Sequence, residues 1–169
     1  MTKAEQNLGC GLTILAMILC CLITSCEKPD ISEDSNLLKE LYANSVDTLE
    51  INTDKYFLET YLYRNFMPGA FKERGLVAVV FLVHSDSTSI HSEINISKLY
   101  IIQNQTIWIS TPKNSTDSFV PVFKQSKVST EGPEWDTEIN ADVIVEILNT
   151  LTKEKYFLAA KNQDIERPE

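Results

Sequence analysis

The chain has 169 residues, which is enough for one domain of ordinary size. It carries 24 acidic and 15 basic residues, and its formal net charge is -9. Because such a charge repels phosphate groups, the composition argues against nucleic acid as a partner and against a membrane contact made through a basic patch.

The first 25 residues have the composition of an export segment. Lys3 lies in a polar N-terminal stretch at residues 1–6, and residues 8–23 are almost purely apolar. That run is shorter than the ~20 residues that a membrane-spanning helix needs, so we expect a signal peptide. All four cysteines lie within residues 1–26, and cleavage before Cys26 leaves only that one. A single cysteine forms no internal disulfide, so the exported domain must be held by its hydrophobic core.

Residues 22–26 read Leu-Ile-Thr-Ser-Cys and resemble the lipobox of bacterial lipoproteins, in which aliphatic residues and a small residue precede a cysteine. The resemblance implies that Cys26 is lipidated, because its thiolate is the nucleophile that takes diacylglycerol as a thioether. It implies a lipid-anchored protein of the cell envelope, at the outer membrane on its periplasmic or outer side, with no cofactor besides the acyl lipid. Two other interpretations stay open: an uncleaved anchor helix, and a secreted protein with a fortuitous cysteine.

Residues 27–34 are charged and have too little apolar content to pack, which is typical of a solvated tether. A lysine with acidic residues close behind the cysteine is similar to the surface-export signals of Bacteroidota lipoproteins. Ser35–Asn44 is then predicted to form a short helix, because Leu37 and Leu41 fall on one face of it. Ser35 is its predicted N-cap.

From residue 46 onward the pattern is that of short strands separated by turns. It is typical of a mainly β fold, here an antiparallel β-sandwich with one short N-terminal helix. The predicted strands are Thr48–Asn52, Tyr56–Tyr63, Leu76–His84, Ile94–Gln103, Thr106–Ser110, Phe119–Phe123, Ala141–Leu148 and Lys155–Lys161. The chain thus divides into a signal peptide at 1–25, a lipid-anchored tether with a short helix at 26–45, and a β-sandwich domain at 46–169.

The predicted strand at Leu76–Val83 is apolar on both faces. In a two-layer sandwich one face of a strand meets the core and the other meets water. We therefore expect something to cover its outer face: the helix at Ser35–Asn44, a loop, or a partner.

Three short motifs carry a second resemblance, which spans residues 47–167. They begin at Arg64 (Arg-Asn-Phe-Met-Pro), at Gly132 (Gly-Pro-Glu-Trp) and at Tyr156 (Tyr-Phe-Leu, with Asn-Gln-Asp-Ile from residue 162). Together they are similar to a group of uncharacterised secreted bacterial domains. The resemblance implies an immunoglobulin-like β-sandwich and implies no activity.

The two histidines of the chain each lie two residues before an acid. His84 with Asp86, and His91 with Glu93, have the spacing that puts both side chains on one face of a strand. If residues 85–90 form a hairpin loop, these side chains converge into a set able to hold zinc or another divalent metal. The alternative is that they are solvated at the end of a strand. Because no ligand motif is present, we predict no metal.

Aromatic and planar side chains are the candidate ligand-binding groups. Trp108 and Trp135 are able to form a platform for sugar rings, as in β-sandwich carbohydrate-binding modules. The other members of that platform are Tyr61, Tyr63 and Tyr100. The alternative for both tryptophans is ordinary core packing. Arg64 adds a planar cation, and its alternative is a bond to an acidic residue or to carbonyls of the Gly132 loop.

Catalysis finds little support in the sequence. Glu131, Glu134, Asp136 and Glu138 surround a Gly-Pro turn, but such acids are usually solvated, whereas acid/base catalysis needs one carboxyl desolvated. We therefore predict a non-catalytic binding domain, held at the membrane by lipid, with a protein or glycan partner in the envelope. The alternatives are a carbohydrate-binding accessory lipoprotein, a metal-dependent or acid/base hydrolase, and a protease or lysozyme inhibitor that presents the loop Thr111–Asp117.

Overall fold

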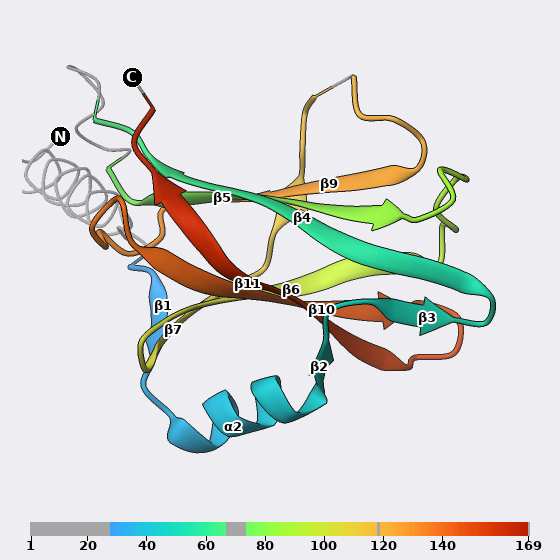
Figure 1. Cartoon of the computed structure of the whole chain (residues 1–169), viewed down its shortest axis with the longest axis horizontal. Coiled ribbons are helices and arrows are strands. Elements are labelled where there is room, and N and C mark those ends of the chain that lie inside the picture. The colour runs from blue at the N-terminus through green and yellow to red at the C-terminus, as the bar shows by residue number, and fades with distance from the viewer. Residues whose placement is uncertain (1–27, 67–73, 118, 169) are drawn as a thin grey trace, which may run out of the picture.

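The computed structural model describes residues 28–66, 74–117 and 119–168, so the export segment, Cys26 and Met67-Pro68 lie outside the described part of the chain. That part forms one helix and eleven strands (Figure 1), which confirms the prediction of a mainly β fold with one short helix. In chain order the elements are β1 (Asp30–Ser32), α2 (Ser35–Asn44), β2 (Ser45–Val46), β3 (Leu49–Ile51), β4 (Asp54–Arg64), β5 (Leu76–His84), β6 (Ile94–Gln103), β7 (Thr106–Ser110), β8 (Lys113–Asn114), β9 (Lys124–Ser129), β10 (Asn140–Asn149) and β11 (Lys155–Glu166).

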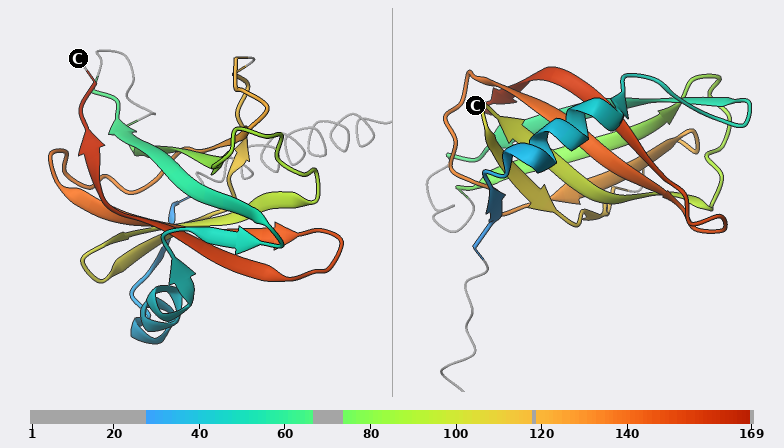
Figure 2. Two further views of the ribbon diagram at one scale, coloured as in Figure 1. Left: turned by 45° about the vertical axis from the view of Figure 1, so that its right-hand side comes forward. Right: turned by 90° about the horizontal axis from the view of Figure 1, so that it is seen from below.

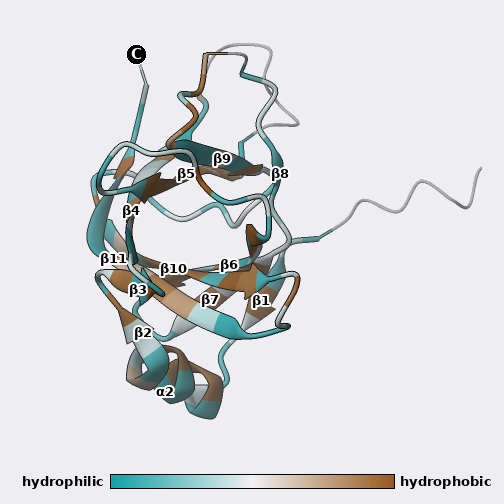
Figure 3. Ribbon diagram, turned by 90° about the vertical axis from the view of Figure 1, so that its right-hand side faces the viewer, coloured by the Kyte–Doolittle hydropathy of each residue, from teal (hydrophilic) through white to brown (hydrophobic). Residues whose placement is uncertain are grey.

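The strands form two layers that face each other across the core (Figure 3). The first layer runs β1-β7-β6-β10-β11, with β2 beside β11, and the second runs β4-β5-β9-β8, with β3 beside β4. β11 joins the layers, because its last residues pair with β4. The sandwich is therefore closed along β11 and β4, and its open side lies between the edge strands β1 and β8.

A bend in β11 lets this strand reach both layers. Its main part pairs antiparallel with β10, and its last two residues pair in parallel with Leu62 and Tyr63 of β4. At the bend Asn162 has a left-handed backbone with φ 54°, and its N–H donates to a carboxylate oxygen of Asp142 at 2.8 Å. The pairing register shifts at this point, as it does at a β-bulge. The sheet is therefore mixed and continuous, whereas the immunoglobulin-like prediction has two separate antiparallel sheets.

α2 lies across the outer face of the first layer (Figure 2). Leu41 is 2 % exposed and packs with Tyr100, Ile107 and Ile144 of the strands beneath it. The helix therefore does not cover the outer face of β5. Of the three covers considered for that face, the helix is wrong, and a loop or a partner is left. No helix within the described residues has the length and apolar character needed to cross a membrane.

The segment before α2 is more ordered than a solvated tether. β1 pairs antiparallel with β7, although residues 27–34 were predicted to be too polar to pack. The helix begins after Asp34, whose carboxylate accepts the N–H of Asn36 at 2.8 Å. Asp34, and not Ser35 as predicted, is therefore the N-cap.

β9 has polar residues at its inward positions, and hydrogen bonds satisfy them. The amide of Gln125 accepts the N–H of Ile96 at 2.9 Å and donates to the carbonyl of Ile94 at 3.1 Å. Lys127 donates to the side-chain oxygen of Asn114 at 2.7 Å, and burial lowers the pKa of its amine. This polarity is the reason that the hydrophobic pattern does not reveal β9.

The segment Phe119–Phe123 is a loop, and its prediction as a strand is wrong. Pro121 has no N–H to give to a ladder, and β9 begins only at Lys124. The apolar side chains that suggested a strand face water instead, with Phe119 90 % exposed and Val122 74 % exposed.

Truncation of Leu41 tests the docking of α2. Leu41→Ala is expected to lower the free energy of unfolding by about 2 to 3 kcal/mol, because it leaves a cavity beneath the helix. Leu151→Ala is the same substitution at an exposed residue, and it is expected to change that free energy by no more than about 0.5 kcal/mol. Urea unfolding followed by tryptophan fluorescence measures both. Equal effects of the two substitutions contradict the docking.

Candidate functional site

The outer face of the second layer is the apolar surface that the sequence predicted to need a cover. Besides Val83, which is buried, strand register places seven apolar or aromatic side chains on it, all of them half-buried or exposed. They are Phe57, Tyr61, Tyr63, Val77, Val79, Phe81 and Val128. We call this surface the β4–β5–β9 face.

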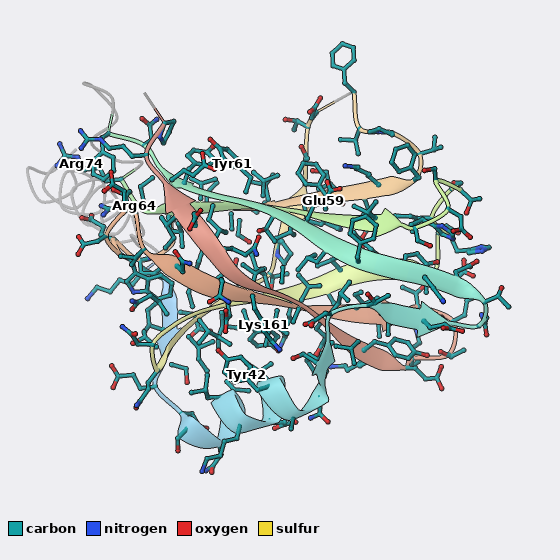
Figure 4. All side chains as sticks on the ribbon, in the orientation of Figure 1. Tyr42, Glu59, Tyr61, Arg64, Arg74 and Lys161 are labelled. Carbon is teal, nitrogen blue, oxygen red and sulfur yellow. The ribbon has the colours of Figure 1, made fainter. Side chains whose placement is uncertain are left out.

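A stacked tyrosine pair stands on this face. Tyr61 and Tyr63 lie two residues apart on β4, and their ring centroids are 5.1 Å apart with an interplanar angle of 29°. Tyr61 is 39 % exposed, and Figure 4 shows it on the side of the molecule away from α2 and Tyr42. Within the described residues neither phenol hydroxyl has a hydrogen-bond partner, so both are available to a ligand.

The charges on the β4–β5–β9 face cancel. Glu59 of β4 and Lys124 of β9 form an ion pair across β5, and the Lys124 amine lies 5.7 Å from the centroid of the Phe81 ring. Because the lysine is held by the carboxylate, it does not give the face a net positive charge. Around Phe81 the surface is thus aromatic and apolar, with this neutralised pair.

A hollow of about 300 Å³ opens at the Tyr63 end of the face. Val77, Val128 and Tyr63 supply its apolar lining, and Thr130 and Glu131 supply polar groups. Its volume is at the lower end of the range for small-molecule sites. Within the described chain, neither the Thr130 hydroxyl nor the Glu131 carboxylate has a hydrogen-bond or ion-pair partner. Both groups are therefore free to bond a ligand.

The turn that carries Glu131 is held firmly against β5. Leu76 donates its N–H to the carbonyl of Pro133 at 3.2 Å, and Gly132 donates to the carbonyl of Leu76 at 3.0 Å. Glu131 has φ 62°, in the left-handed region that side chains other than glycine rarely adopt. Gly132 lies so close to Trp108 that a Cβ there would be 2.6 Å from the indole ring. These contacts fix the backbone of Glu131 at the hollow.

Arg64 fastens the same turn to β4. Its Nε donates to the carbonyl of Arg74 at 2.8 Å and its Nη1 donates to the carbonyl of Trp135 at 2.6 Å. Its Nη2 lies 3.5 Å from the carboxylate of Glu134, and the guanidinium lies 4.8 Å from the centroid of the Phe66 ring. These bonds confirm the structural interpretation of Arg64 as a link between loops. Its contact with a ligand stays a prediction.

Comparisons of this chain with family models, with curated proteins and with solved structures find no match. No residue role is therefore carried over from another protein. The site is defined by its own geometry: a stacked tyrosine pair, an apolar hollow, and two unpaired polar groups at that hollow.

The predicted aromatic platform is divided among different parts of the fold. Trp108 is 2 % exposed and belongs to the core, and Trp135 is partly buried against it. Tyr100 lies beneath α2. The structure therefore brings together only Tyr61 and Tyr63 of the five predicted members. For Trp108 the alternative interpretation, ordinary core packing, is therefore the one that the structure supports.

The two histidines meet at Asp54, which the sequence did not single out. Nε2 of His84 lies 3.4 Å from one oxygen of Asp54, and Nε2 of His91 lies 3.2 Å from the other. Asp86 contributes its N–H, which donates to Nδ1 of His84 at 3.2 Å, and Glu93 lies 3.9 Å from His91. In the described ranges no three histidine, cysteine or acidic side chains are arranged to hold a metal ion.

The connection that carries these histidines is not the hairpin loop that was considered for residues 85–90. β5 belongs to the second layer and β6 to the first, so residues 85–93 cross between layers. The ring of Tyr56 packs edge-on against His84 at 5.2 Å, and burial followed by the charge of Asp54 raises the pKa of Tyr56 to about 12. The group therefore ties the start of β4 to the crossing, which is a structural role.

A larger cleft of about 430 Å³ lies on the open side of the sandwich. Its charged residues are of both signs, with Lys28, Lys98 and Lys113 beside Asp30 and Glu131. Mixed charges of this kind are well solvated, and the cleft lies where the described chain begins. It is for these reasons a weaker ligand site than the hollow on the β4–β5–β9 face.

The acids around the Gly-Pro turn serve different places and form no catalytic pair among those described. Glu134 lies beside Arg64, and the N–H of Glu138 donates to the carbonyl of Ile165 at 2.9 Å. Glu131 alone lines the hollow. The sequence missed this role, and it missed Thr130 and Val128. Its one relevant signal was the apolar outer side of β5.

Proposed function

We propose that this chain is a bacterial lipoprotein that holds a non-catalytic binding domain outside the cytoplasm, with lipid on Cys26 as its anchor. Its binding surface is the β4–β5–β9 face. The observation that carries the proposal is that α2 covers the outer face of the first layer, while the aromatic outer face of the second keeps half-exposed side chains. An exposed apolar surface with polar groups at its edge is typical of an interaction site.

The short distance between anchor and domain supports this function. Only residues 27–29 separate Cys26 from β1, a stretch that spans about 10 Å when extended. The domain therefore stays close to the surface that holds the lipid, and its partner is a component of the envelope or a molecule that reaches it. Two or three acyl chains anchor a protein stably in a membrane, whereas a single chain binds weakly and reversibly.

The anchor is tested by replacing Cys26 with serine. Cys26→Ser is expected to abolish both incorporation of an alkyne-labelled fatty acid and recovery in the membrane fraction, because a hydroxyl does not replace the thiolate as nucleophile. Cys21→Ser changes a neighbouring cysteine outside the lipobox position and is expected to keep label and location. In-gel fluorescence and fractionation measure both. Equal labelling of the two variants contradicts the anchor.

The binding face is tested by photo-crosslinking in intact cells. Benzoylphenylalanine in place of Tyr61 is expected to give a discrete adduct after irradiation. The same substitution at Tyr42 is the matched control, because that residue is 38 % exposed against 39 % for Tyr61 and lies on the opposite side of the molecule (Figure 4). Adducts at Tyr42 and none at Tyr61 place the partner elsewhere and contradict the proposed face.

A further inference from the structure

We infer that the β4–β5–β9 face binds a neutral polysaccharide, with one pyranose ring seated in the hollow beside Tyr63. The inference rests on the proposed function, because it names the ligand of the same face.

The apolar part of the site matches one side of a sugar ring. A pyranose has an apolar C–H face, which packs on aromatic rings and aliphatic side chains, and a polar edge of hydroxyl groups. The Tyr63 ring, Val77 and Val128 line the hollow and supply the apolar contact. Tyr61 is stacked on Tyr63 and continues the aromatic surface outside the hollow, where a second ring of the chain lies.

The polar part of the site matches the hydroxyl edge of that ring. Thr130 and Glu131 line the same hollow, and within the described residues their side chains are unpaired. A carboxylate accepts hydrogen bonds from two neighbouring hydroxyls, and such charge-assisted bonds are stronger than neutral ones. The backbone of Glu131 is fixed by the Gly132–Leu76 hydrogen bond, so little order is lost on binding.

Charge selects a neutral ligand over an acidic one. Among the described residues, Glu131 is the one charged side chain that lines the hollow, and the Glu59–Lys124 pair cancels farther along the face. The chain as a whole has a net charge of -9, which repels uronates, phosphates and a second copy of itself. A flat protein surface leaves the carboxylate and hydroxyl of the hollow without partners, whereas a polyhydroxylated ring bonds both.

The test is calorimetric titration of the full lipidated chain, purified in detergent. The probes are cellohexaose, maltohexaose, mannohexaose and xylohexaose, with hexagalacturonate as the acidic counterpart. We expect at least one neutral hexasaccharide to bind, and hexagalacturonate to bind at least about tenfold more weakly because of repulsion by Glu131 and the net charge.

Two pairs of matched variants locate the site. Tyr61→Ala and Glu131→Gln are each expected to weaken binding about tenfold, since each removes one interaction worth about one power of ten in affinity. Tyr42→Ala removes a tyrosine of equal exposure on the other side of the domain, and Glu138→Gln changes an exposed acid whose φ of 64° matches that of Glu131. Both controls are expected to bind within about twofold of the unchanged chain.

The outcomes separate this inference from the proposed function. Absence of binding to all four neutral hexasaccharides overturns the polysaccharide ligand, and equal binding by Glu131→Gln and Glu138→Gln overturns its position in the hollow. If the Tyr61 crosslink then gives a protein adduct, the proposed function stands with a protein partner. If the crosslink also fails, the face is not a binding surface and both statements fall.

Discussion

Replacing Arg64 with methionine is expected to lower the free energy of unfolding by about 3 to 5 kcal/mol. Arg64 is 6 % exposed, and its guanidinium gives hydrogen bonds to the carbonyls of Arg74 and Trp135. Methionine keeps the apolar stem but removes the hydrogen bond that Arg64 donates to each carbonyl, at a cost of about 1 to 3 kcal/mol each. The Glu134 side chain is 70 % exposed, so the loss of its ion pair with Arg64 adds little to the cost.

Arg167→Met is the matched control for this substitution. Arg167 lies over the same Phe66 ring as Arg64, at 5.0 Å against 4.8 Å, but it is exposed. Its replacement is expected to change the free energy of unfolding by no more than about 0.5 kcal/mol. Urea unfolding of both variants, followed by tryptophan fluorescence, measures the difference. A loss of similar size in both variants means that stacking on Phe66, and not hydrogen bonding, is what Arg64 contributes.

Replacing Gly132 with alanine is expected to cost about 3 kcal/mol of stability. The added Cβ would lie 2.6 Å from one carbon of the Trp108 ring and 2.8 Å from the carbonyl oxygen of Leu76. The ring is held in the core and the oxygen belongs to the backbone, so neither moves away cheaply. The turn beside the hollow must shift instead, and its hydrogen bond to Leu76 weakens.

A double-mutant cycle separates the two contacts of Gly132. In a Trp108→Phe background the six-membered part of the indole is gone, so Gly132→Ala is expected to cost at least about 1 kcal/mol less than in the unchanged chain. Chemical unfolding of the four chains gives the coupling energy. A coupling energy of zero shows that the Leu76 carbonyl, and not the indole ring, is what requires glycine.

Elements with a clear local pattern were predicted with their observed bounds. The helix Ser35–Asn44 and the strands Leu76–His84, Ile94–Gln103 and Thr106–Ser110 are the examples. In each of them apolar residues recur at the helical or strand period, or fill a run bounded by turn residues. That information is carried by neighbours in the chain. It does not depend on what each element packs against.

Pairing and layering were predicted poorly, because they depend on residues far apart. A hairpin at residues 85–90 was considered as one possibility, but a chain of the same local pattern can turn back in its own layer or cross to the other layer, as it does between β5 and β6. The bend at Asn162 that makes β11 a member of both layers leaves only a short polar motif in the sequence. β9 was missed because buried hydrogen bonds make its polar inward side acceptable.

The candidate site shows the same division. The sequence indicated an apolar outer side on β5 and named Tyr61, Tyr63 and Arg64, since each is visible as a residue type in a pattern. It did not place Thr130 and Glu131 beside them, because these residues come from another segment.

The amino-acid sequence by itself determined the local elements, the acidic charge and the presence of one more apolar surface than a two-layer core needs. Only the tertiary structure decided which surface α2 covers and which residues surround the hollow. The physical reason is the range of the interactions. Periodicity and capping act within a few residues. A helix can dock and strands can pair in several ways that bury similar apolar area, and contacts between residues far apart in the sequence determine which arrangement is most stable.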